Sequence, residues 1–192
     1  IPDSVTSIGS SAFYNCDGIK KFNVTDGLNV IGGYALNDCD SITELVIPDS
    51  VIIIETYAFY GCSNLDRISI SEGVTNIGEY AFGGCTQISS IVLPVSITSI
   101  GNYAFSGTSF TSITIPDGVT SIGNGIFSGC NALASITVDK DNSKYVSVNN
   151  CIIESSTKTL VAGCKTSIIP TDGTVTKIGD NAFYGCTSLT TI

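Results

Sequence analysis

Residues 65–85, LDRISISEGVTNIGEYAFGGC, contain one complete unit of a pattern that repeats along the whole chain. The second half of this unit has the form I-G-x-x-A-F-x-x-C, and related segments occur in seven places. Its alanine falls at positions 12, 35, 58, 81 and 104, so the period is 23 residues. A fixed period of this length is typical of solenoids, in which each repeat stacks on its neighbours.

Each half of the unit predicts its own local structure. Ile68 and Ile70 alternate with polar residues, which indicates a β-strand with one buried face. A proline or an equivalent residue then ends the strand, and the short A-F-x-x-C segment indicates one turn of 3₁₀- or α-helix. Because one unit cannot bury its own apolar residues, we expect stacked units to share columns of Ile, Phe and Cys. The equivalent isoleucines should then lie on neighbouring strands of one parallel sheet: Ile68, Ile91, Ile113 and Ile136.

The composition excludes several functional classes. The chain has 192 residues, a net charge of −9 and a pI of about 4.1, whereas nucleic acids and anionic membranes are bound by basic surfaces. It has no histidine, which excludes a histidine base, a Ser-His-Asp triad and a histidine-ligated metal. No run of about 18 apolar residues occurs, so we expect no membrane-spanning helix. No nucleophile has an evident base, so we predict no enzyme activity and no cofactor.

The full pattern L-x-x-I-x-I-P-x-x-V-x-x-I-G-x-x-A-F-x-x-C resembles the BspA-like leucine-rich repeat of bacterial surface proteins, over essentially the whole chain. The resemblance implies a repeat solenoid of the leucine-rich-repeat type. This would be a right-handed horseshoe, mainly β with short 3₁₀ or α turns, and with a parallel sheet on its concave face.

The resemblance also implies a function and a location. The implied location is extracellular or at the cell surface. The implied function is a non-catalytic module for adhesion or for binding a protein or glycan partner on another cell or a host surface. A structural spacer that presents other parts of a larger surface protein is the alternative, because one fold can serve unrelated functions.

The repeats predict a single solenoid over residues 1–192, interrupted once. The spacing from Ile126 to its equivalent Ala182 is 56 residues, which leaves 33 added residues beyond the regular 23. We expect residues 139–170 to form an irregular repeat with a β-hairpin, of a kind that the resemblance also implies. Neither end of the chain shows a polar capping repeat, so we expect an internal piece of a longer extracellular protein.

The tip of the hairpin is expected near Ser155–Lys158. A polar run there separates two apolar arms, and exposed polar loop tips are typical of hairpins. A turn at this place would set Cys151 opposite Ala162 rather than opposite Cys164. A disulfide between the two cysteines is therefore less favoured than free thiols.

Two sets of residues are candidates for contact with a partner. Charged side chains gather in the first repeats at positions expected on the concave strands: Lys20, Lys21, Glu44, Asp66 and Arg67. They form either a recognition patch or ion pairs between neighbouring strands. The second set precedes the alanine of successive repeats: Tyr34, Tyr57, Tyr80 and Tyr103. These tyrosines form either an aromatic strip for glycan or protein contact or a stack in which each ring packs on the next.

Six of the eight cysteines occupy one position of the repeat: Cys16, Cys39, Cys62, Cys85, Cys130 and Cys186. Neighbouring coils lie about 4.8 Å apart with parallel Cβ vectors, whereas a disulfide needs converging Cβ atoms about 3.8 Å apart. We therefore expect buried thiols that pack as small apolar groups. A straight column of thiols also cannot surround a tetrahedral metal ion.

Overall fold

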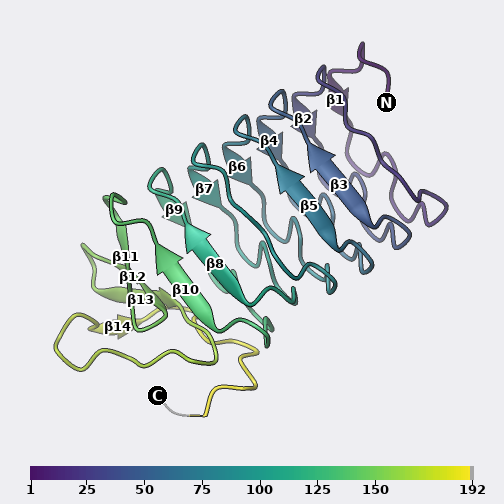
Figure 1. Cartoon of the computed structure of the whole chain (residues 1–192). Helices are drawn as coiled ribbons and strands as arrows, with labels where there is room; N and C mark the ends of the chain where they lie inside the picture. The colour runs from purple at the N-terminus through teal and green to yellow at the C-terminus, as the bar shows by residue number, and fades with distance from the viewer. Residues whose placement is uncertain (191–192) are drawn as a thin grey trace.

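The computed structural model describes residues 1–190 as a row of stacked coils that starts from the N-terminus (Figure 1). No helix occurs among these residues, and β-strands are joined by turns and extended segments. Residues 191 and 192 of the predicted solenoid lie outside the described residues. The six regular coils are numbered as coil 1 (5–24), coil 2 (28–47), coil 3 (51–70), coil 4 (74–93), coil 5 (97–115) and coil 6 (119–138).

Most coils contribute a two-residue strand and a four-residue strand, and the irregular segment adds strands of its own. The bounds are β1 Ser7–Ile8, β2 Val30–Ile31, β3 Glu44–Ile47, β4 Ile53–Ile54, β5 Arg67–Ile70, β6 Asn76–Ile77, β7 Ser99–Ile100, β8 Ser112–Ile115, β9 Ser121–Ile122, β10 Ser135–Val138, β11 Tyr145–Val148, β12 Cys151–Glu154, β13 Thr159–Ala162 and β14 Lys177–Ile178.

The two-residue strands of the six coils form one continuous parallel sheet in the order β1-β2-β4-β6-β7-β9. Equivalent residues lie side by side, as Ile54 lies beside Ile77. Gly78 donates its N–H to the carbonyl of Ile54 at 2.8 Å, and a Cβ on Gly78 would lie 2.5 Å from the carbonyl carbon of Glu55. The glycine after this isoleucine therefore permits the close stacking of coils.

The four-residue strands do not form one sheet. β3 pairs with β5, and β8 pairs with β10, as two separate parallel pairs. Ile91 lies in no strand, and no backbone hydrogen bond of the described residues joins residues 89–93 to coil 3 or coil 5. The expectation that one sheet would run through Ile68, Ile91 and their equivalents is therefore wrong.

Prolines explain where the pairing fails. The residue after each long segment can donate its N–H to the preceding coil, as Ser71 does to the carbonyl of Ile47 at 3.0 Å and Asp139 does to that of Ile115 at 2.9 Å. These bonds accompany the two strand pairs that form. Coils 2, 4 and 5 instead carry a proline, which has no N–H to donate, at this position: Pro48, Pro94 and Pro116. Pairing is accordingly absent between coils 1 and 2, 3 and 4, and 4 and 5.

This explanation predicts the effect of adding a proline. Ser71→Pro should lower the free energy of unfolding by about 1–3 kcal/mol, because the buried carbonyl of Ile47 would lose its donor. Thr25→Pro is the matched control at the same repeat position, since the Thr25 N–H makes no hydrogen bond within residues 1–190. Urea unfolding of both variants measures the difference, and equal losses would contradict the explanation.

The A-F-x-x-C segments are successive turns rather than a helical turn. In coil 4 the N–H of Gly83 donates to the carbonyl of Tyr80, three residues back, at 2.9 Å. The N–H of the neighbouring Phe82 instead donates to the carbonyl of Ala104 in coil 5, also at 2.9 Å. Tyr80 and Gly84 have positive φ values of 51° and 73°, which a right-handed helix cannot contain. The expected turn of 3₁₀- or α-helix is therefore not found in residues 1–190.

Apolar side chains of successive coils form columns between the faces of the solenoid. Phe59, Phe82 and Phe105 are fully buried, and their rings lie nearly parallel with centroids 5.4 and 6.0 Å apart. Isoleucine, leucine and alanine of the repeat are buried beside them. The predicted columns are thus the core of the protein.

The cysteine column adds hydrogen bonds to this core. Cys39, Cys62, Cys85 and Cys130 are buried as expected, whereas Cys16 and Cys186 of the same column are only half-buried, and all eight cysteines are free. The thiol of Cys62 lies 3.1 Å from the carbonyl of Leu36 in the preceding coil, and its equivalents make the same contact. The thiols therefore act as donors to buried carbonyls as well as small apolar groups.

Residues 139–170 form an irregular segment after coil 6. β11, β12 and β13 make an antiparallel meander, and β14 adds to it in parallel beside β13. Residues 155–158 form the turn between β12 and β13. A register shift after Ile152 sets Ile152 opposite Ala162, so the expected pairing of Cys151 with Ala162 is wrong.

Candidate functional site

Residues 65–70 and the equivalent segments of the other coils lie side by side on one face of the solenoid, which we call the strand face. Two cavities open on this face. Both lie where strand pairing is interrupted. The 4/5 groove, between coils 4 and 5, has a volume of about 370 Å³, and the 1/2 groove, between coils 1 and 2, has a volume of about 300 Å³. Each cavity thus lies where a proline, Pro116 or Pro48, leaves two coils unpaired.

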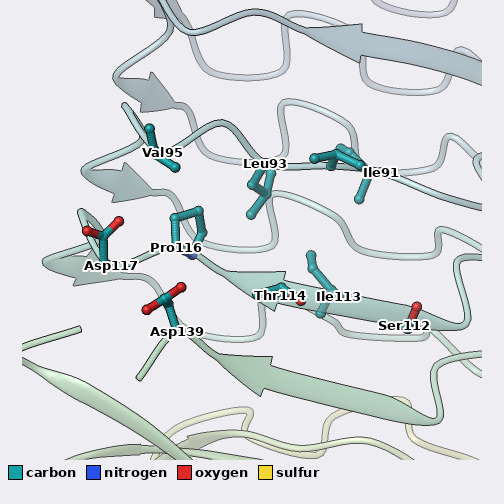
Figure 2. Close-up of a pocket in the computed structure, with 10 residues that line it drawn as sticks. Ile91, Leu93, Val95, Ser112, Ile113, Thr114, Pro116, Asp117 and Asp139 are labelled. Carbon is teal, nitrogen blue, oxygen red and sulfur yellow. The ribbon is translucent and has the colours of Figure 1, made fainter. Parts of the chain in front are cut away.

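The 4/5 groove has a wall of aliphatic side chains, polar groups at Ser112 and Thr114, and an acidic end. Val92 and Val95 are 81% and 66% exposed, which is unusual for aliphatic side chains. Asp117 and Asp139 lie together beyond Pro116, at the end of the groove opposite Ser112 and Ile91 (Figure 2). Such a groove can bind a side chain that combines an aliphatic stem with a positive charge.

The predicted charged residues lie at the other end of the molecule. Glu44 of β3 is directly beside Arg67 of β5, and their side chains form an ion pair at 3.4 Å. Lys21 and Glu44 line the 1/2 groove, whereas Lys20 and Asp66 are exposed and do not line it. Ion pairing between neighbouring strands thus accounts for Glu44 and Arg67, at little gain in stability because both are exposed. A recognition role for this set stays a prediction.

The four predicted tyrosines form a continuous stack. The rings of Tyr34, Tyr57, Tyr80 and Tyr103 are 4.7–4.8 Å apart and within 14° of parallel. Burial, followed by the neighbouring phenols, raises the pKa of Tyr57 and Tyr80. Since each inner ring covers the face of the next, these faces are not free to stack on a sugar. Contact with a partner would use ring edges and hydroxyls, and an aromatic binding strip stays a prediction.

The grooves were not anticipated from the sequence, although their signal was present. The alternation of proline and other residues at one repeat position marks which coils pair. Val46 and Val92 replace the polar residue of the outward column in coils 2 and 4, and each lines one groove. The available signal was therefore Val46 with Pro48 of the same segment, and Val92 with Pro116 of the following coil.

The described residues show neither a group of metal ligands nor an activated cysteine. Within residues 1–190 no three Cys, Asp or Glu side chains are grouped so that they could hold a metal ion. Burial raises the pKa of the Cys62 thiol to about 12, which is the opposite of what a nucleophilic cysteine needs. No helix that could cross a membrane occurs in the part of the chain that the structure describes.

Solved bacterial leucine-rich repeat proteins have similar structures. One from Bacteroides ovatus is 29% identical, with a TM-score of 0.64, over 97% of this chain and 45% of that protein. A leucine rich cell surface protein from Faecalibacterium prausnitzii is 27% identical, with a TM-score of 0.66, over 98% of this chain and 64% of that protein. The chain thus spans less than two thirds of the length of either protein.

Comparison with family models gives the same result, whereas no curated protein matches the chain. The model of the BspA type leucine rich repeat region matches six copies, over residues 1–108, 54–161 and 154–192. These matches together span the whole sequence and confirm the resemblance seen in the repeat pattern. The chain therefore belongs to the BspA type leucine-rich repeat family.

Proposed function

We propose that the chain is a non-catalytic binding module, outside the cell or on its surface, that recognises a protein or glycan partner on another cell or a host surface. The open strand face carries this proposal, because two grooves expose valines and charged groups where paired strands would otherwise close the surface. Exposed apolar patches rimmed by polar groups are typical of interaction sites. The surface location is supported by the similar Faecalibacterium prausnitzii protein, which is described as a cell surface protein.

The proposal is tested by binding of the fluorescent chain to cultured epithelial cells and to bacterial cells. Saturable binding is expected, and it should fall at least about tenfold when Val46→Lys and Val92→Lys place two charges in the grooves. Ile52→Lys with Ile168→Lys is the matched control, because these exposed isoleucines lie outside both grooves. Absence of saturable binding to either cell type, or equal loss in both double variants, would contradict the proposal.

A structural spacer is the second candidate function. It is favoured by the small polar residues that dominate the outward column of the strand face, such as Ser69, Thr114 and Thr137. Aromatic and arginine side chains, which dominate most binding surfaces, are scarce there. A spacer predicts that the chain shows no saturable binding and that the Val46→Lys, Val92→Lys variant behaves as the parent does.

A further inference from the structure

We infer that the 4/5 groove receives an arginine side chain of a partner protein. This inference rests on the proposed binding function and names the side chain that the site would take. Three features of the groove support it: free carbonyl oxygens, an apolar wall and two carboxylates.

Free carbonyl oxygens result from the missing strand pairing. In coil 5 the carbonyl of Ile115 faces coil 6 and accepts the N–H of Asp139 at 2.9 Å. The equivalent carbonyl in coil 4 belongs to Leu93, and it faces Pro116, which has no N–H. Neither Leu93 nor Ile91 has a donor to its carbonyl within residues 1–190. The groove thus offers acceptors to a ligand rich in N–H groups.

The apolar wall fits the stem of a long side chain. Ile91, Leu93 and Pro116 are largely covered, whereas Val92 and Val95 stand out beside them. A whole peptide strand cannot enter between coils 4 and 5, because the pairing of β6 with β7 holds these two coils together. A single side chain with three methylene groups can lie along this wall while its backbone stays outside.

The charge of the groove selects a cation. Asp117 and Asp139 lie at its end (Figure 2), and only one oxygen of Asp139 is engaged, by the N–H of Asp141 at 2.9 Å. Neither carboxylate has an ion pair within residues 1–190: Lys140, which follows Asp139, pairs with Asp141 at 2.6 Å, and Lys144 pairs with Glu154 at 3.3 Å. A guanidinium, with five N–H donors in a planar fork, can meet carboxylates and carbonyl oxygens together, whereas an ammonium is a point charge.

The 1/2 groove lacks this selectivity. Lys21 lines it together with Glu44, and Glu44 is already paired with Arg67 at 3.4 Å. Its charges are therefore balanced within the protein. It provides an internal comparison for the same probe.

The test is a titration of the ¹⁵N-labelled chain with the peptide acetyl-Gly-Val-Arg-Val-Gly-amide, followed by amide chemical shifts. We expect shifts at Val92, Leu93, Ser112 and Asp117, and none in coils 1 and 2. The peptide with citrulline in place of arginine, which is neutral and of the same shape, should bind about tenfold more weakly. Equal binding of citrulline or lysine peptides, or absence of shifts at up to about 10 mM, would overturn the inference.

Protein variants complete the test. Asp117→Asn with Asp139→Asn should weaken binding of the arginine peptide about tenfold. Asp26→Asn with Asp49→Asn removes the same charge from exposed positions beside the other groove and should leave binding unchanged. If the parent chain binds the arginine peptide but does not bind cells, only the proposed function is contradicted. If the Asp117→Asn, Asp139→Asn variant binds cells normally and the peptide causes no shifts in the parent, only the arginine site is contradicted.

Discussion

Phe82→Ala is expected to lower the free energy of unfolding by about 3–5 kcal/mol. Phe82 is fully buried, and its ring lies between those of Phe59 and Phe105 at centroid distances of 5.4 and 6.0 Å. Removal of the ring leaves a cavity shared by three coils, which the hydrogen bonds between coils prevent from collapsing. In a solenoid the stability of each coil depends on its neighbours, so the loss affects both sides of coil 4.

Phe13→Ala is the matched control, since Phe13 occupies the same repeat position in coil 1. It is half-buried and has one aromatic neighbour in the described chain, Phe22, at 5.4 Å and nearly edge-on. We expect Phe13→Ala to cost less than half as much as Phe82→Ala. Guanidinium unfolding of both variants gives the comparison, and equal costs would show that the phenylalanine column is not the centre of the core.

The columns could be predicted because they depend only on residue type and period. Any arrangement that buries Ile54 beside Ile77 with a spacing of 23 residues must stack the coils in register. The local backbone was less predictable. The positive φ of Tyr80 is costly for a side chain with a Cβ, and its equivalents Ser11 and Asn181 share it, so the turn itself requires this conformation. In Tyr80 the stacking with Tyr57 and Tyr103 offsets part of the cost.

The strand face could be predicted only in part, because its pairing depends on single N–H groups. Ser71 and Pro94 occupy the same repeat position, and both end a strand segment, yet only Ser71 donates to the preceding coil. The two residues are equivalent in the periodic pattern but differ in their hydrogen bonds. The charged residues of this face could be found in the sequence because they depend on residue type alone. The 4/5 groove could not, because it depends on the missing N–H of Pro116.

High pH is expected to destabilise the protein through its cysteine column. The buried thiol of Cys62 donates to the carbonyl of Leu36, and burial raises its pKa from 9.0 to about 12. A raised pKa in the folded state means that this contribution is complete below pH 9 and is lost as the pH rises from 9 towards 12. At pH 11, two pH units above the pKa of the unfolded thiol, the free energy of unfolding is lower by about 3 kcal/mol because of Cys62 alone.

Cys62→Thr separates this effect from other titrations. Thr108 stands in the same column in coil 5, where its hydroxyl donates to the carbonyl of Phe105 at 2.8 Å and has no proton to lose in this range. Between pH 8 and 11 the variant should therefore lose about 3 kcal/mol less stability than the parent, as measured by urea unfolding at each pH. Tyrosines titrate in both proteins and cancel in the difference. Parallel pH profiles for parent and variant would show that the column does not depend on protonated thiols.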